Sequence, residues 1–124
     1  MKKKKILIID DEVDLTQMIK LNLEATGKYD VSIENKGSRA IAAIRTFKPD
    51  MVFLDIVMPD ADGANVIQQI NEEEDLKNIP VVFLTALVKK EETREDSIKT
   101  ISSHTFLAKP VSTRELIDCI EKNT

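Results

Sequence analysis

Several residue types are scarce in this sequence of 124 residues. It has one cysteine, one histidine, one tyrosine and no tryptophan, with only three glycines and four prolines. A single cysteine cannot form an internal disulfide, which excludes a disulfide-stapled secreted fold, and we expect Cys119 to be a small core thiol on a terminal helix. The low glycine and proline counts exclude collagen-like and mucin-like chains. With a hydrophobic fraction of 42%, residues 1–124 are expected to form one globular domain.

Long hydrophobic runs and an excess of basic charge are also missing. No apolar run approaches the ~18 residues of a membrane span. The run at residues 6–9 is too short to make the N-terminal lysines part of a signal peptide. The net charge of −4 gives no field that would attract nucleic acid or anionic lipid. We therefore expect a cytoplasmic protein with no direct nucleic-acid binding and no membrane partner.

Familiar nucleotide and hydrolase motifs are absent as well. Neither G-x-x-x-x-G-K-[ST] nor G-x-G-x-x-G occurs, so the sequence has no P-loop and no dinucleotide fingerprint. His104, the only histidine, precedes the last predicted strand and offers no credible base for a hydrolase triad. The acidic run Asp10-Asp11-Glu12 would repel the phosphate of FMN, which argues against a flavodoxin.

What the sequence does contain is an alternation of buried strands and amphipathic helices. Short apolar or alternating stretches predict five strands, at residues 6–9, 29–33, 51–54, 81–84 and 105–108. Apolar residues at helical spacing lie between them and after the last, around residues 15–23, 40–47, 66–70 and 116–120, while the polar stretch 89–103 predicts a loosely held fourth helix. This pattern predicts an α/β fold with a doubly wound, five-stranded parallel sheet in the flavodoxin-like order 2-1-3-4-5 and helices on both faces.

Polar side chains follow the predicted central strands where ligands bind in such a fold. The first strand runs into Asp10 and Asp11, the third ends at Asp55, the fourth at Thr85, and the fifth at Lys109. Carboxylates about 4 Å apart repel by about 4 kcal/mol per pair at an effective dielectric near 20. Three of them are therefore expected to need a compensating cation, and Mg²⁺ fits an all-oxygen site by its chemistry and availability.

These residues, with Met58-Pro59 and Asp62-Gly63 after Asp55, Ala86 after Thr85, and Phe106 before Lys109-Pro110, resemble the receiver domain of bacterial two-component response regulators. The resemblance covers nearly the whole chain in order. It implies that Asp55 accepts a phosphoryl group from a sensor histidine kinase or phosphotransfer protein, and that the chain is not a turnover enzyme but promotes only its own phosphorylation and dephosphorylation.

The resemblance also implies a role for each matching residue. Asp10, Asp11, Asp55 and the backbone carbonyl of Val57 would hold Mg²⁺. Lys109 would pair with the phosphoryl group, whose oxygens would be bound by the Thr85 hydroxyl and the Ala86 N–H. Thr85 and Phe106 would switch the face formed by the fourth helix, fifth strand and fifth helix, and so control a downstream target or effector domain.

Two other interpretations compete with this one. A Mg²⁺-dependent phosphohydrolase of the haloacid dehalogenase type would need a second acid two residues after the nucleophile, where this chain has Val57. A phosphorylation-independent interaction module would be favoured by loss of an acidic residue or the lysine, and none is lost. The sequence departs from the receiver pattern at Ser102-Ser103, where the family usually has Gly-Ala, and near residues 89–92.

Overall fold

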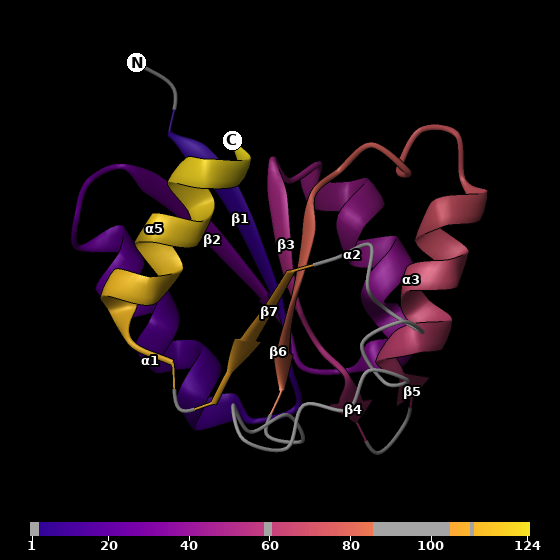
Figure 1. Cartoon of the computed structure of the whole chain (residues 1–124), viewed down its shortest axis with the longest axis horizontal. Coiled ribbons are helices and arrows are strands. Elements are labelled where there is room, and N and C mark those ends of the chain that lie inside the picture. Colours follow the sequence, from indigo (N-terminus) through magenta and orange to yellow (C-terminus); the bar gives the residue numbers. More distant parts are fainter. Residues whose placement is uncertain (1–2, 59–60, 86–104, 110) are drawn as a thin grey trace.

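A five-stranded parallel sheet forms the centre of the molecule, as the sequence predicts (Figure 1). The computed structural model describes residues 3–58, 61–85, 105–109 and 111–124. The strands of this sheet are β1 (Lys4–Ile9), β2 (Tyr29–Glu34), β3 (Met51–Asp55), β6 (Val81–Thr85) and β7 (Thr105–Ala108). Their order is β2-β1-β3-β6-β7, and every neighbouring pair is parallel. Numbered among themselves, the five strands follow 2-1-3-4-5, so the predicted fold is confirmed.

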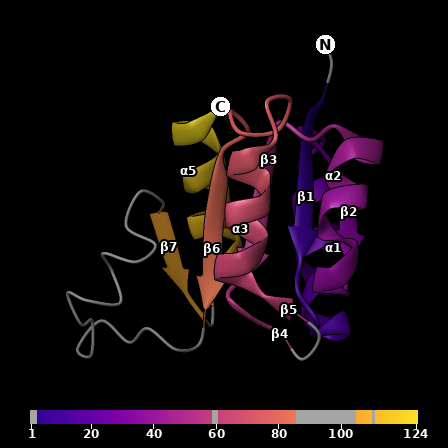
Figure 2. The same ribbon diagram turned by 90° about the vertical axis from the view of Figure 1, so that its right-hand side faces the viewer.

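Helices cover both faces of this sheet. On one face lie α1 (Val13–Glu24) and α5 (Thr113–Asn123), and on the other lie α2 (Ala40–Phe47), which follows the short 3-10 turn η1 (Gly37–Arg39), and α3 (Gly63–Glu72) (Figures 1 and 2). Because successive side chains of a strand point to opposite faces, Ile6 and Ile8 enter the core under α1 and α5, whereas Leu7 and Ile9 enter the core under α2 and α3. All four are fully buried, which explains the continuous apolar run of β1.

Two helix termini coincide with residue types that commonly cap or end helices. Gly27 has a φ of 77°, the left-handed conformation that glycine adopts at little cost, in the turn after α1. Ser112 caps α5: its hydroxyl accepts the Glu115 N–H, and the Glu115 carboxylate accepts the Ser112 N–H. Cys119 is buried on the inner face of α5, as predicted.

Three features differ from the sequence-based prediction or fall outside it. The two-stranded antiparallel ladder of β4 (Val57–Met58) and β5 (Ala61–Asp62) was not foreseen, because two-residue strands have no detectable period. Met18 is one of the apolar residues in the predicted helical stretch 15–23, but it is 51% exposed, since it lies about 100° around the helix from the buried Ile19. The predicted fourth helix at 89–103 lies outside the described residues.

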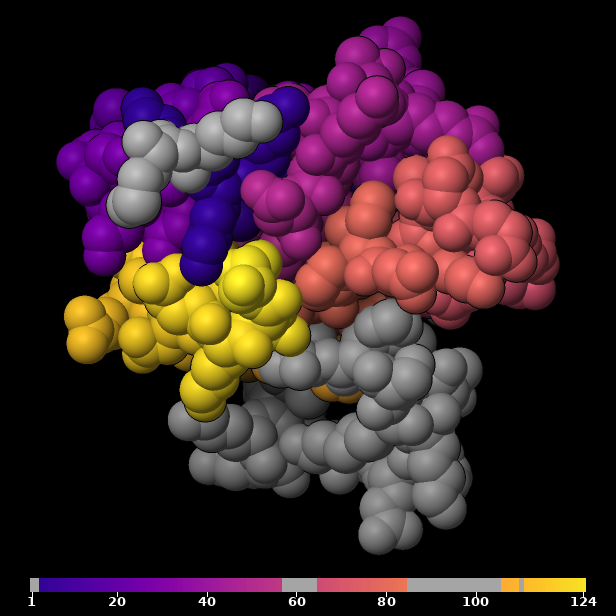
Figure 3. Space-filling model, turned by 90° about the horizontal axis from the view of Figure 1, so that it is seen from above, coloured from indigo at the N-terminus to yellow at the C-terminus, as the bar shows by residue number. Residues whose placement is uncertain are grey.

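The two ends of the sheet differ in character. Both termini lie at the amino ends of the central strands (Figures 1 and 3). A groove at that end is lined by Lys3, Lys4, Lys5, Asp50, Pro80, Asn123 and Thr124. Asp10, Asp55 and Lys109 all lie at the other end, where the strands finish. The predicted acidic site is therefore separate from this groove.

Candidate functional site

Asp10 is the first residue after β1 and is completely buried. Its N–H donates to the Glu34 carbonyl at 3.0 Å, which extends the β1–β2 ladder by one bond. Its carboxylate Oδ1 accepts the Glu12 N–H at 2.9 Å. The backbone therefore fixes both the position and the orientation of this carboxylate.

Asp55 ends β3, the strand beside β1, and its residue is 5% exposed. The adjacency of β1 and β3 brings the carboxylates of Asp10, Asp11 and Asp55 together, with one oxygen of each within 4.8 Å of the others. Three carboxylates at this spacing form an all-oxygen donor set of the kind that Mg²⁺ prefers. The structure thus brings together the three acidic residues that the sequence singled out.

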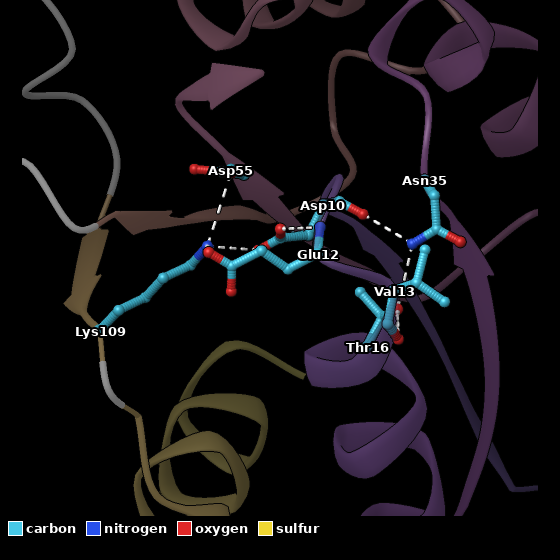
Figure 4. Close-up of polar contacts among 7 residues, drawn as sticks. All are labelled: Asp10, Glu12, Val13, Thr16, Asn35, Asp55 and Lys109. Atoms are coloured by element: carbon cyan, nitrogen blue, oxygen red, sulfur yellow. Dashed lines mark hydrogen bonds and ion pairs between the residues drawn. The ribbon is translucent and has the colours of Figure 1, made fainter. Parts of the chain in front are cut away.

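Lys109 directly follows β7 and reaches across the end of β6 into this cluster (Figure 4). Its Nζ lies 2.7 Å from Asp10 Oδ2, 3.5 Å from Asp55 Oδ2 and 3.6 Å from Glu12 Oε1, and its side chain is only 10% exposed. Among the described residues, it is the cation that pairs with the cluster. The ammonium thus contacts the carboxylates of Asp10, Glu12 and Asp55, and Asp11 adds a fourth carboxylate to the cluster, which leaves an excess of negative charge.

The electrostatic balance keeps Lys109 charged. Burial lowers the pKa of its ammonium, but the short contact with Asp10 and the charges of Asp10, Asp55 and Glu12 together outweigh burial, so the pKa is raised. This contact is an ion pair rather than a well-directed hydrogen bond, because Asp10 Oδ2 has no partner of hydrogen-bonding geometry within the described parts of the chain. A buried carboxylate oxygen without a hydrogen-bond donor is suited to act as a metal ligand. The three carboxylates together fit a divalent cation.

The remaining predicted residues are described to different extents. Val57 begins β4 two residues after Asp55, and the backbone of Thr85 pairs in register with Ala108 at the end of β7. Phe106 lies on β7, partly buried, with its ring against that of Phe83. Ala86 lies outside the described residues. The roles of Val57, Thr85 and Ala86 stay predictions.

Asn35 and Thr16, which contact the backbone behind the cluster, were not predicted from the sequence. The Asn35 amide Nδ2 donates to the Asp10 carbonyl at 2.7 Å and to the Thr16 hydroxyl at 3.1 Å. Thr16 is completely buried. The sequence offered one signal for this contact. Thr16 lies beside Leu15 and three residues before Ile19, on the inward face of a helix, and a buried hydroxyl needs a hydrogen-bond partner.

Comparison with known proteins decides the family. Residues 6–121 match the family described as the response regulator receiver domain. The chain belongs to this family. It is therefore a receiver domain of two-component signal transduction, as the resemblance in its sequence implied. Membership of this family favours the receiver interpretation over a phosphohydrolase of the haloacid dehalogenase type.

Two curated relatives are 34% identical to this receiver domain. They are the alkaline phosphatase synthesis transcriptional regulatory protein PhoP of Bacillus subtilis, over 113 residues, and the DNA-binding dual master transcriptional regulator RpaA of Synechocystis, over 115 residues. Each alignment covers 91% of this chain but only 45% and 46% of the two relatives. The chain thus spans less than half the length of these regulators.

Solved structures agree with the fold. The receiver domain of the Francisella response regulator 1452 is 30% identical, with a TM-score of 0.81 over 97% of this chain and 95% of its own. The Vibrio cholerae chemotaxis protein CheY4 has a TM-score of 0.84 over 99% of this chain and 100% of its own, at 23% identity, and so supports the fold alone. Within the described residues, no helix has the length and apolarity needed to cross a bilayer.

Proposed function

We propose that residues 1–124 act as one receiver domain that accepts a phosphoryl group on Asp55 from a phosphohistidine of a sensor histidine kinase or phosphotransfer protein. The observation that carries this proposal is the position of Asp55. It ends a central strand, next to Asp10 and Asp11, with the Lys109 ammonium 3.5 Å from its Oδ2.

The transfer is a displacement at phosphorus. An Asp55 carboxylate oxygen forms the new P–O bond while the P–N bond to the donor histidine breaks, and the electron pair of that bond stays on the imidazole, which is then protonated. The transition state spreads negative charge over three phosphoryl oxygens, so positioning and charge neutralisation provide most of the catalysis. Lys109 supplies positive charge beside the attacking carboxylate of Asp55.

The acidic cluster is the proposed metal site. Asp10, Asp11 and Asp55 would hold Mg²⁺, together with the Val57 carbonyl. When bound, Mg²⁺ would neutralise part of the charge on the transferring group. The Thr85 hydroxyl and the Ala86 N–H would bind phosphoryl oxygens. The domain would promote only its own phosphorylation and dephosphorylation, rather than turn over a separate substrate.

Phosphorylation would act on partners through Thr85 and Phe106. A charge-assisted hydrogen bond would draw the Thr85 hydroxyl toward the phosphoryl group, and the Phe106 ring would respond by changing its packing. The affected face would comprise residues 89–103, β7 and α5, and it would bind a downstream protein or an effector domain. The DNA-binding activity named for RpaA belongs to that longer protein, and we propose no nucleic-acid contact for residues 1–124. The cytoplasmic location stays a prediction.

The decisive experiment is phosphorylation by acetyl phosphate in Mg²⁺, followed by mapping of the added mass. We expect one phosphoryl group, on Asp55, and none in EDTA. Asp55→Asn should not be labelled, whereas the control Asp30→Asn, at an exposed position of β2, should be labelled like the wild type. Undiminished labelling of Asp55→Asn would refute the proposal.

A further inference from the structure

Asn35 ties together the ends of three elements behind the acidic cluster. It directly follows β2, and its amide Nδ2 donates to the carbonyl of Asp10, after β1, and to the hydroxyl of Thr16, in α1 (Figure 4). The two contacts are 2.7 and 3.1 Å long. Asn35 touches none of the carboxylates in these contacts, so any effect on them must pass through the backbone.

The hydrogen bond from Asn35 to the Asp10 carbonyl takes the place of a ladder bond that β1 and β2 do not form at this position. In a continued parallel ladder, the Asp10 N–H would donate to Glu34, as it does, and the Asp10 carbonyl would accept the N–H of Lys36. The Lys36 N–H instead donates to the side chain of Glu34, at 3.0 Å from Oε1. The Asn35 amide supplies the missing donor, which lets β2 leave the sheet while the end of β1 stays fixed.

Thr16 provides the second anchor. Its N–H donates to the Glu12 carbonyl at 3.0 Å, and its hydroxyl donates to the Val13 carbonyl at 2.8 Å. With its hydrogen used in this way, the hydroxyl oxygen can accept the Asn35 amide. The turn from Asp10 to Glu12 is therefore held at the strand by one Asn35 contact and at the helix by the other.

We propose that Asn35, assisted by Thr16, is a positioning residue that orients Asp10 and Asp11 for binding a divalent cation. The inference rests on the metal site of the proposed function. Asp11 lies between the two anchored points, so its direction depends on the backbone that Asn35 holds. Partners that orient metal ligands commonly change metal affinity about 10- to 100-fold when removed.

The test is a titration of the full chain with Mg²⁺, followed by amide NMR shifts. Asn35→Ala should raise the Mg²⁺ dissociation constant about 10-fold or more. Asn123→Ala is the matched control: its amide also donates to a backbone carbonyl, that of Cys119, at 2.7 Å, but it lies at the end of α5. This control should lose one amide–carbonyl bond without changing the dissociation constant.

Variants at Thr16 separate positioning from general stability. Thr16→Val removes the hydroxyl at nearly constant shape and should weaken Mg²⁺ binding, whereas Thr16→Ser keeps the hydroxyl and should bind like the wild type. In the Asn35→Ala background, Thr16→Val should have no further effect on the dissociation constant. Hydrogen exchange measured without metal should show faster exchange of the Glu12 amide in Asn35→Ala than in Asn123→Ala.

The possible failures are distinguishable. If the wild type gives no Mg²⁺-dependent shifts, the metal part of the proposed function is wrong. If the wild type binds Mg²⁺ and Asn35→Ala binds it equally well, the positioning role is wrong while the metal site stands. If Asn123→Ala weakens binding as much as Asn35→Ala, the effect is one of stability, and the positioning role is again refuted.

Discussion

Phe106 stacks on Phe83, with ring centroids 5.6 Å apart and ring planes inclined by 28°. The two residues are register partners on β7 and β6. Phe83 is fully buried in the core under α2 and α3, whereas Phe106 is partly exposed and packs against that core. A phenylalanine has no hydroxyl with which to hold one position, so the Phe106 ring is held by packing, in which the Phe83 ring takes part.

The first prediction concerns this aromatic pair. Beryllofluoride with Mg²⁺, a phosphate mimic for Asp55, should shift the ring resonances of Phe106 and Phe83, because any movement of one ring changes the ring current at the other. Phe47, which lies under the Lys5 ammonium at the opposite end of β1, should shift little and serves as the internal control. NMR of the assigned phenylalanine rings checks this, and an unchanged Phe106 would contradict the proposed switch.

The second prediction concerns Lys109. Lys109→Met leaves Asp10 and Asp55 buried without their cation, which should lower the free energy of unfolding in EDTA by about 3–5 kcal/mol. Mg²⁺ should restore more stability to this variant than it adds to the wild type, because it takes over the neutralisation of the carboxylates. Urea unfolding with and without Mg²⁺ measures both effects.

A surface lysine provides the control for Lys109. Lys77 pairs with Glu74 at 3.0 Å, and both side chains are exposed. Lys77→Met should change the free energy of unfolding by no more than about 1 kcal/mol, with no Mg²⁺ dependence. A loss in Lys109→Met as small as this would show that Lys109 does not compensate the buried cluster.

The parts of the fold that the sequence predicted correctly are those with a strong local period. Residues 6–9 are apolar without interruption because both faces of β1 are covered, and Asp10 follows where the strand ends. Because β1, β3 and β7 end at the same edge of the sheet, Asp10, Asp55 and Lys109 lie in one cluster although they are far apart in the sequence.

Features that depend on the register between distant segments could not be predicted in this way. Asn35 reaches the Asp10 carbonyl, 25 positions away, only because β1 and β2 pair as they do and β2 then leaves the sheet. Composition and period do not show which side-chain amide meets which carbonyl. The β4–β5 ladder has the same difficulty, since its strands are too short to have a period.

The third prediction concerns Cys119. Burial raises the pKa of its thiol, although the charge of Lys122 and the hydrogen bond from Asn123 lower it in part. Since only the thiolate reacts, and the side chain is buried, the native protein should react with a thiol reagent at least 10-fold more slowly than the urea-unfolded chain. Equal rates in the two states would mean that α5 opens readily from the sheet.

Glu121 joins the end of α5 to the start of the sheet. Its Oε2 lies 3.0 Å from the Lys4 ammonium and accepts the Tyr29 hydroxyl at 3.4 Å. Burial raises the pKa of the Tyr29 phenol, and the charge and hydrogen bond of Glu121 raise it further. Because the folded chain favours the neutral phenol, this contribution to stability is present below the ordinary pKa of 10.0 and is lost as the pH rises through the raised value.

The fourth prediction follows from this arrangement. Tyr29 is the only tyrosine and the chain has no tryptophan, so ultraviolet absorbance at alkaline pH reports its ionisation alone. Glu121→Gln removes the charge beside the phenol and should lower the pKa of Tyr29, but burial, the largest cause, should keep it above 10.0. Asp118→Asn, on the exposed side of the same helix, should leave the titration midpoint unchanged. A midpoint in Glu121→Gln equal to that of the wild type would show that the carboxylate does not act on Tyr29, and that burial alone raises its pKa.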